Sequence, residues 1–226
     1  DEKNLNYASY DNDLYDKKLE TLIKCNKEGN IIIKDGVKKI TSGAFLNTVT
    51  GITLPESIES ISGWRLIPYS VNYLYIPQNL NNIDMTSIMD LKEIEVSEEN
   101  TKYKSIEKKY LVSKDEKTLY WVSKGATNID DLPNSIENIN NYAFAFCSNL
   151  NEIILKDGIK TIGYASFYYS NNLKRVRIPN SVTKIFNGAF VMANNLTEII
   201  IHKQRGEIAG EPWGAVYGTR AIQYDE

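Results

Sequence analysis

Apolar residues recur at a fixed interval along most of this chain. An apolar anchor follows a short polar turn in each of six copies, and successive anchors within each half lie 21 to 23 residues apart. Isoleucine follows each anchor by three residues, and a large apolar residue follows it by eight. The anchors are Val37, Ile58, Leu80, Ile136, Ile159 and Val182. A repeat of this length predicts a solenoid, in which each copy forms one coil.

Every copy also contains a short stretch in which apolar residues alternate with outward positions. Such stretches, bounded by proline or by Asp-Gly and Asn-Ser turns, predict short half-buried strands. They occupy residues 31–33, 52–54, 74–76, 94–96, 153–155, 176–178 and 199–201. One strand per coil predicts a stacked parallel sheet, because a single coil cannot bury its own apolar face without a neighbour.

The combined pattern resembles the BspA-like subclass of bacterial leucine-rich repeats. Residues 176–199 and 132–150 follow I-x-I-P-x-S-V-x-x-I-x-x-x-A-F-x-x-C-x-x-L, with Cys147 at the cysteine position. The resemblance covers roughly residues 30–96 and 128–224. It implies an α/β-type solenoid, a right-handed superhelix with short parallel strands on its concave face. The second copy departs from the pattern, since Trp64, Arg65 and Leu66 stand where Ala-Phe is expected.

Two related segments interrupt the repeat. Residues 103–125 contain two apolar runs around the turn SKDEKT, and residues 7–24 have the same outline, so both are predicted to be β-hairpins. The end of the chain changes to Gly, Pro and Trp, and we expect Trp213 to cover the last coil while Ile222 and Tyr224 form a final strand. We therefore predict one domain, 1–226. It is divided into an amino-terminal hairpin (1–29), a first repeat block (30–96), a hairpin insert (97–129), a second block (130–205) and a cap (206–226).

Composition narrows the classes of function. The net charge of −3, without a dense basic patch, argues against nucleic acid as a partner. No run of residues is apolar enough to predict a transmembrane segment, and the chain shows no export signal. The single histidine, His202, excludes a multi-histidine metal site, and we predict neither metal nor cofactor. Localisation, secreted or on a bacterial cell surface, is an implication of the resemblance alone.

The residues that could suggest catalysis or metal binding each have a structural explanation. Cys147 stands where the next two copies have Ser170 and Ala193, so a small buried packing position is expected rather than a nucleophile. Cys25 has no imidazole or basic cluster beside it in the sequence, and a disulfide between the two cysteines stays open. The Asp-Gly pairs occupy the turn that Pro-Asn and Pro-Glu occupy elsewhere, as turn residues do. We predict no enzymatic activity; carboxylate-catalysed glycan cleavage is the less favoured alternative.

The remaining candidate for function is the outward side of the strands. If alternate residues face the core, the others form rows on the concave face, and aromatic, arginine and isoleucine side chains there are typical of interfaces. The expected ligand-binding residues are Tyr73, Tyr75, Glu93, Glu95, Ile154, Arg175, Arg177 and Ile200. We interpret the chain as a recognition or adhesion module for a protein or glycan. A structural spacer within a longer surface protein is the alternative.

Overall fold

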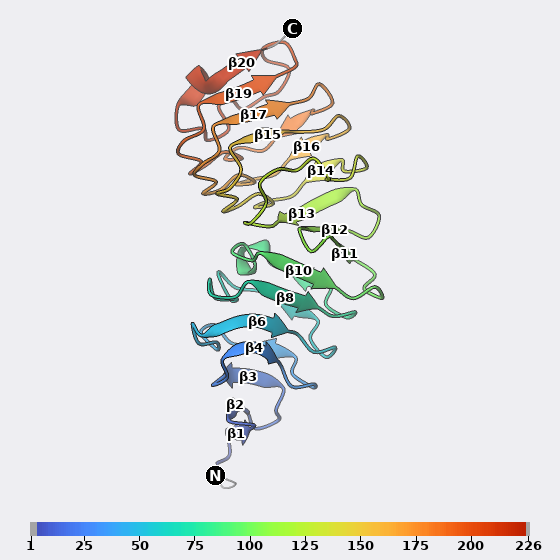
Figure 1. Cartoon of the computed structure of the whole chain (residues 1–226), viewed down its shortest axis with the longest axis vertical. Helices are drawn as coiled ribbons and strands as arrows, with labels where there is room; N and C mark the ends of the chain where they lie inside the picture. Colours follow the sequence, from blue (N-terminus) through green and yellow to red (C-terminus); the bar gives the residue numbers. More distant parts are fainter. Residues whose placement is uncertain (1–3, 225–226) are drawn as a thin grey trace. The chain divides into compact units, whose positions relative to one another are not determined.

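A computed structural model describes residues 4–224 of the chain, so residues 1–3 and 225–226 at the ends of the predicted domain lie outside it. The chain forms two compact units, residues 1–105 and 106–226. Each unit consists of stacked coils made almost wholly of short strands (Figure 1). Residues 4–224 contain no α-helix, only two 3₁₀ segments, η1 (Met85–Ser87) and η2 (Gly218–Ala221). The molecule is therefore a β-solenoid, and the α/β class predicted from the sequence is wrong.

The predicted strands form one parallel sheet in each unit. In unit 1 the sheet order is β10-β8-β6-β4, and in unit 2 it is β15-β17-β19-β20. Their bounds are β4 (Gly29–Ile32), β6 (Val49–Thr53), β8 (Tyr73–Ile76), β10 (Glu93–Val96), β15 (Glu152–Ile154), β17 (Arg175–Ile178), β19 (Glu198–Ile201) and β20 (Ile222–Tyr224). Successive strands pair in register, as Ile153, Val176 and Ile199 do on the buried side. The repeat thus fixes which residues of each strand face the core.

Each coil has a second, shorter strand that the sequence patterns did not indicate. These two-residue strands end on the isoleucine three residues after each anchor. Those of the second and third coils of unit 1, and those of the three coils of unit 2, pair in parallel with one another. They are β5 (Lys39–Ile40), β7 (Ser60–Ile61), β9 (Asn82–Ile83), β14 (Asn138–Ile139), β16 (Thr161–Ile162) and β18 (Lys184–Ile185). A single buried isoleucine gives no period-two pattern, so the sequence offered no signal for these strands.

Hydrogen bonding explains why the segment between the two strands of a coil is not helical. In the coil that begins at Ile136, alternate N–H groups donate to the next coil: Tyr142 to the Tyr164 carbonyl and Phe144 to the Ser166 carbonyl. The N–H groups between them donate locally, as Ala143 does to Asn140. An α-helix would need every N–H group for its own turns. Stacking against the next coil therefore replaces helix formation here.

The core of unit 2 is built from equivalent residues of successive coils. Phe144, Phe167 and Phe190 are fully buried and stack at centroid distances of 5.2 and 5.0 Å. Burying an aromatic side chain supplies a large share of core energy, and stacked pairs add about 0.5–1.5 kcal/mol each. The small slot predicted for Cys147, Ser170 and Ala193 is confirmed, since the exposed fraction of all three is zero. The two cysteines are free thiols.

Both predicted hairpins are confirmed, and both stand before the first coil of their unit. In unit 1, β2 pairs antiparallel with β1 and β3, and Leu22 of β3 pairs with Ile40 of β5. In unit 2, β12 pairs antiparallel with β13, and Leu119 of β13 pairs with Ile139 of β14. The strands are β1 (Tyr7–Tyr10), β2 (Asp13–Asp16), β3 (Thr21–Lys24), β12 (Tyr110–Ser113) and β13 (Thr118–Val122), while β11 (Tyr103–Ile106) spans the unit boundary. The last hairpin strand thus takes the place of a short strand.

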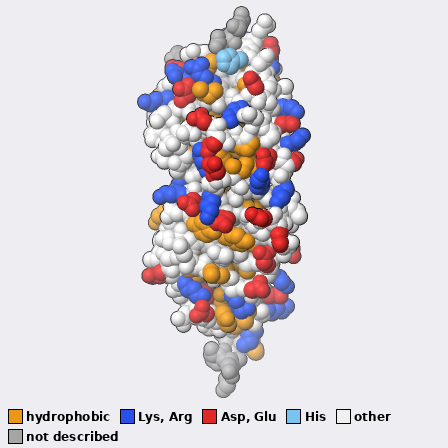
Figure 2. Space-filling model, turned by 45° about the vertical axis from the view of Figure 1, so that its right-hand side comes forward, with side chains coloured by type: hydrophobic (Ala, Val, Ile, Leu, Met, Phe, Trp, Pro, Cys, Tyr) orange, Lys and Arg blue, Asp and Glu red, His pale blue; other side chains and the backbone are white. Residues whose placement is uncertain are grey.

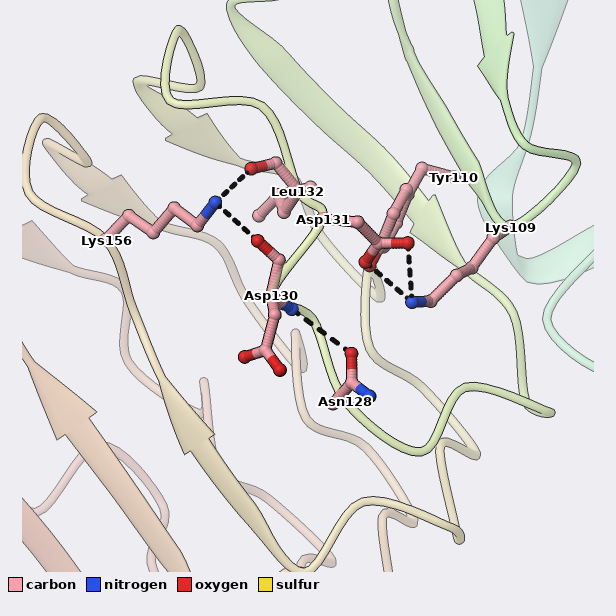
Figure 3. Close-up of polar contacts among 7 residues, drawn as sticks. All are labelled: Lys109, Tyr110, Asn128, Asp130, Asp131, Leu132 and Lys156. Atoms are coloured by element: carbon pink, nitrogen blue, oxygen red, sulfur yellow. Dashed lines mark hydrogen bonds and ion pairs between the residues drawn. The ribbon is translucent and has the colours of Figure 1, made fainter.

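A polar clasp holds the second hairpin to the segment that follows it (Figure 3). Asp131 accepts hydrogen bonds from Lys109 Nζ at 2.6 Å and from the Tyr110 hydroxyl at 2.5 Å. Lys156 Nζ donates to the carbonyls of Asp130 and Leu132, at 2.8 and 2.5 Å. Partial burial acts to raise the pKa of Asp131, but the hydrogen bonds from Lys109 and Tyr110 outweigh it and hold that pKa below its usual value.

The last coil of unit 2 is closed by an atypical end, as predicted. Trp213 is fully buried, its indole N–H donates to the Ala209 carbonyl at 2.8 Å, and its own carbonyl accepts from Phe190 N–H at 3.0 Å. The final strand β20 pairs in parallel with β19. Trp213 therefore occupies the position that the next coil would take.

Candidate recognition face

The outward side of each long-strand sheet carries two rows of side chains. In unit 1 the rows are Asn30, Gly51, Tyr73 and Glu93, and then Ile32, Thr53, Tyr75 and Glu95. In unit 2 they are Glu152, Arg175 and Glu198, and then Ile154, Arg177, Ile200 and Gln223. Neighbours in a row are spaced by the distance between strands, about 4.8 Å. We call these surfaces the unit 1 face and the unit 2 face.

The unit 1 face combines aromatic rings with carboxylates. The Tyr73 hydroxyl donates to Glu95 Oε2 at 3.1 Å, which ties the two rows together. Next to Tyr73, Gly51 lies under the Asn30 amide: a Cβ atom at Gly51 would stand 2.4 Å from Asn30 Oδ1. A side chain at Gly51 would therefore displace Asn30. This face is acidic and aromatic, with no basic residue in either row.

The first row of the unit 2 face, Glu152, Arg175 and Glu198, alternates in charge and is joined by ion pairs. Arg175 lies between two glutamates, with Nε 2.5 Å from Glu198 Oε2 and Nη1 3.6 Å from Glu152 Oε2. Arg177 Nε lies 3.1 Å from Glu152 Oε1, which links the two rows. The hydrogen bond with Glu198 raises the pKa of Arg175 further, and the same contact lowers the pKa of Glu198. Glu198 is thus held ionised, which suits an ion pair and opposes a role as general acid.

Exposed isoleucines mark the first strand of each sheet. Ile32 on β4 is 73% exposed and Ile154 on β15 is 60% exposed. Each has a row neighbour on one side only, because β4 and β15 are edge strands of their sheets. Ile200 has row neighbours on both sides, Arg177 and Gln223, and is 8% exposed. The expectation that Ile200 is an exposed ligand contact is thus not met, although its place in the row is as predicted.

The other expected residues lie in the predicted rows. Tyr73, Tyr75 and Glu95 are partly buried and Glu93 is exposed, all on the unit 1 face. Arg175 and Arg177 are partly buried beside exposed Ile154 on the unit 2 face. Their role in ligand binding stays a prediction. Figure 2 shows hydrophobic side chains bordered by acidic and basic ones on the surface that also carries the single histidine, His202.

Two open hollows lie at the two ends of the unit 2 strands. The larger, about 680 Å³, adjoins Ile154 and Arg177. The turns that follow the strands complete its lining with Asn134, Leu155, Lys156, Asp157, Pro179, Asn180 and His202. The smaller hollow, about 250 Å³, is lined by Asn151, Glu152, Lys174, Arg175, Thr197 and Glu198. Sequence reasoning assigned the Asp-Gly and Pro-Asn turns to folding alone and so missed their contribution to the larger hollow.

Residues 4–224 show no arrangement suited to catalysis by thiol or metal. Burial raises the pKa of Cys147, and burial is also the main cause of the raised pKa of Cys25, so both stay protonated thiols. Across the described range no three His, Cys, Asp or Glu side chains are grouped so that they could hold a metal ion. No helix within residues 4–224 has the length and apolar character to span a membrane.

Comparison of the sequence with family models decides the family. The model for the BspA type leucine-rich repeat region matches residues 20–127 and 116–211. The chain belongs to this family. The expected resemblance is thereby confirmed, and no catalytic family is indicated. Comparison with curated protein sequences gives no match.

A solved structure with a TM-score above 0.5 supports the same fold. A leucine-rich repeat protein from Eubacterium ventriosum is 15% identical, with a TM-score of 0.60 over 93% of this chain and 75% of its own. A leucine-rich cell surface protein from Faecalibacterium prausnitzii is 21% identical, with a TM-score of 0.44 over 80% of this chain and 61% of its own. The pneumococcal vaccine antigen PcpA is 16% identical, with a TM-score of 0.45 over 92% of this chain and 63% of its own. This BspA-type chain therefore spans less than two thirds of the latter two proteins.

Proposed function

We propose that this chain is a non-catalytic recognition module that binds a protein partner through the unit 2 face. The observation that carries the proposal is Ile154, which is 60% exposed beside Arg177 and lines the larger hollow. An exposed isoleucine beside a recess and bordered by charges has the anatomy of an interface, with an apolar centre and a polar rim. Ile154 would enter the partner's surface, and Arg177 beside it would orient a carboxylate or carbonyl group.

The charge pattern favours a protein over a charged glycan at this face. Glu152 and Glu198 are balanced by Arg175 and Arg177, so the formal charges of the face sum to zero and a uniformly charged polymer gains little there. A folded partner can place single opposite charges along the face and fix its register. Solvent screens exposed ion pairs, so the rows would give specificity while Ile154 gives most of the affinity.

The proposal includes a bacterial surface or secreted location and a role in adhesion. Membership in the BspA-type family supports the location. It also includes one leucine-rich repeat domain over residues 1–226, a right-handed superhelix, and long strands on its concave side. The proposal also assigns ligand binding to the unit 1 face, with Tyr73, Tyr75, Glu93 and Glu95.

A structural spacer is the second candidate function. The observation that favours it is the repeated hairpin: β3 and β13 pair with the first short strand of their units in the same register. A unit of hairpin plus coils that occurs twice is the kind of element that lengthens a surface protein. A spacer would need no partner at Ile154, which separates the two candidates experimentally.

The test compares three proteins as bait for solubilised surface and extracellular proteins of host and neighbouring bacterial cells. These are the wild type, the face variant Ile154→Asp/Arg177→Glu, and a matched control, Val216→Asp/Arg205→Glu. The control residues belong to unit 2 but not to its face; Val216 is 55% exposed and Arg205 is exposed. We expect at least one protein to be retained by wild type and control and released by the face variant. Equal retention by all three would contradict the proposal and favour the spacer.

A further inference from the structure

A second surface of unit 2, separate from the strand face, consists wholly of uncharged residues. It is formed by the turn segments 140–151, 163–173 and 186–196, which connect the short and long strands of three successive coils. None of these segments contains Asp, Glu, Lys or Arg, although charged residues make up 24% of the chain. In unit 1 the turn of the first coil is also uncharged, but the turns of the next two coils contain Arg65, Asp84 and Asp90. Of the two units, unit 2 alone therefore has three successive uncharged turns.

Aromatic rings cover this surface and contact one another across the coils. We define the aromatic strip as Tyr142, Phe146, Tyr164, Tyr168, Tyr169 and Phe186. Tyr168 meets Tyr142 and Phe146 edge to face at centroid distances of 6.0 and 5.8 Å, and Phe146 stacks on Tyr169 at 5.5 Å. Because these contacts fix the rings, they would lose little conformational freedom when a ligand binds.

The rings of the strip are fixed but not buried. Tyr164 is 46% exposed and Phe186 is 41% exposed, while Tyr142, Phe146, Tyr168 and Tyr169 are partly buried. The core of these coils is already complete, with its own stack of fully buried phenylalanines beneath. The exposed ring surface thus adds nothing to the core.

Three bulky residues of the strip have positive φ angles, a backbone conformation that glycine adopts with less strain. Tyr142, Phe146 and Tyr169 have φ angles of 61°, 59° and 54°, a region that disfavours bulky residues. The coil that begins at Val182 has Gly188, with φ of 83°, at the position of Tyr142. The fold therefore accepts glycine at this turn. A bulky ring held in a strained conformation, with part of its surface still exposed, indicates a use beyond folding.

The polar groups of the three turns themselves are amides and hydroxyls, and the Lys184 Nζ of β18 lies 4.2 Å from the Phe186 ring centroid. Asn187 and Asn194 are exposed on the same turns, and Tyr142, Tyr164, Tyr168 and Tyr169 add phenolic hydroxyls. Such groups donate and accept hydrogen bonds without carrying charge. A partner protein would meet no arginine and no carboxylate within these turns, although arginine is enriched at protein interfaces. The ligand that matches aromatic rings, amides and hydroxyls without charge is a neutral sugar, with apolar C–H faces and hydroxyl edges.

We propose that the aromatic strip binds a neutral polysaccharide. Sugar rings would lie against the exposed tyrosine and phenylalanine rings, and their hydroxyl groups would bond to the asparagine amides and phenol hydroxyls. The rings of the strip lie on three successive coils that are stacked at the strand spacing of about 4.8 Å, so a polymer meets several rings at once. Affinity therefore rises with polymer length, and a monosaccharide binds weakly. This site is independent of the protein-binding face.

The experiment is affinity electrophoresis of the full chain in gels containing soluble barley β-glucan, mannan or dextran, with heparin and alginate as charged probes. We expect retardation by at least one neutral polysaccharide, unchanged by added salt, and none by the charged ones. Tyr164→Ala/Phe186→Ala should weaken that binding by about tenfold or more. Both residues are exposed, and unchanged far-ultraviolet circular dichroism checks that the variant is folded.

Two further variants make the result specific. Trp64→Ala/Tyr69→Ala removes two rings of unit 1 that are 56% and 63% exposed, and it should bind the polysaccharide like wild type. The face variant Ile154→Asp/Arg177→Glu should also bind it like wild type, which separates this proposal from the protein-binding one. Retardation by no neutral polysaccharide, by heparin or alginate alone, or equally in wild type and the strip variant would overturn the proposal. Loss in the Trp64/Tyr69 control or in the face variant would place the site elsewhere.

Discussion

Replacing Gly188 by alanine tests the geometry of the aromatic strip directly. Gly188 has a φ of 83°, and a Cβ atom built on it lies 2.7 Å from Tyr164 Cε2 and 3.0 Å from Cδ2. The Tyr164 ring therefore lies against the glycine backbone, and alanine would meet two separate penalties. One is the left-handed conformation, and the other is displacement of the ring.

The two penalties can be given magnitudes. An L-residue in the left-handed region costs about 1–2 kcal/mol. Tyr164 is 46% exposed and can swing outward, but it then loses its edge-to-face contact with Tyr142, whose centroid lies 5.9 Å away. Such a contact is worth about 0.5–1.5 kcal/mol. Gly188→Ala should therefore lower the free energy of unfolding by about 2–3 kcal/mol.

A double-mutant cycle separates these contributions. In a Tyr164→Ala background there is no ring to displace, so Gly188→Ala should cost only the conformational part, about 1–2 kcal/mol. The coupling between the two positions is then about 1 kcal/mol, measured by urea denaturation followed by circular dichroism. If Gly188→Ala costs the same in both backgrounds, the ring does not lie against Gly188. If it costs nothing in either, the left-handed conformation is not required.

Three other predictions concern the core, the clasp and the thiols. Phe167→Ala empties the middle of the phenylalanine stack and should lower the free energy of unfolding by about 3–5 kcal/mol. Phe186→Ala removes an exposed ring and should change that free energy by less than about 1 kcal/mol. Similar losses for the two variants in urea titrations would refute the assigned packing. Asp131→Asn should lower the urea midpoint at neutral pH, because Asp131 has a lowered pKa when folded. A carboxylate whose pKa is lower in the folded state stabilises the fold above its unfolded-state pKa, and this stabilisation is lost as the pH falls through its folded-state pKa. The difference in urea midpoint between wild type and Asp131→Asn should therefore shrink in acid. A difference that stays constant with pH would count against the ion pair. Cys147 should resist iodoacetamide in the native protein and react after denaturation, because burial raises its thiol pKa and shields it; rapid native labelling would contradict this packing.

The sequence predicted those parts of the fold in which apolar and polar residues alternate along a strand. Long strands such as the one around Val176 repeat a period-two pattern in phase, so their existence and register followed without coordinates. The short strands were missed because each contributes one buried isoleucine, such as Ile162. The helical part of the predicted class was wrong because N–H groups such as that of Phe144 donate to the next coil, a long-range choice that local pattern does not encode.

The candidate faces could be predicted in part. The rows follow from register, but the exposure of a residue within a row depends on its neighbours. Ile154 and Ile200 occupy equivalent positions, yet one lies at a sheet edge and the other between two long side chains. The aromatic strip was not predicted, because its rings lie at irregular positions of the turns. The absence of charge across three successive turns was the available signal.

The hydrogen bonds between the turns of successive coils have the same pattern in each coil, so one coil of unit 2 can replace another in the stack. Phe144 N–H donates to the Ser166 carbonyl, and Phe167 N–H donates to the Ala189 carbonyl of the coil after it. Excising residues 159–181 would join Gly158 to Val182 and present the same acceptors to the preceding turn. Each such deletion or duplication would change the length of the stack by about one strand spacing, 4.8 Å, without altering the cap at Trp213. The length of the unit 2 solenoid can thus change by whole coils through deletion or duplication of the residues that form one coil.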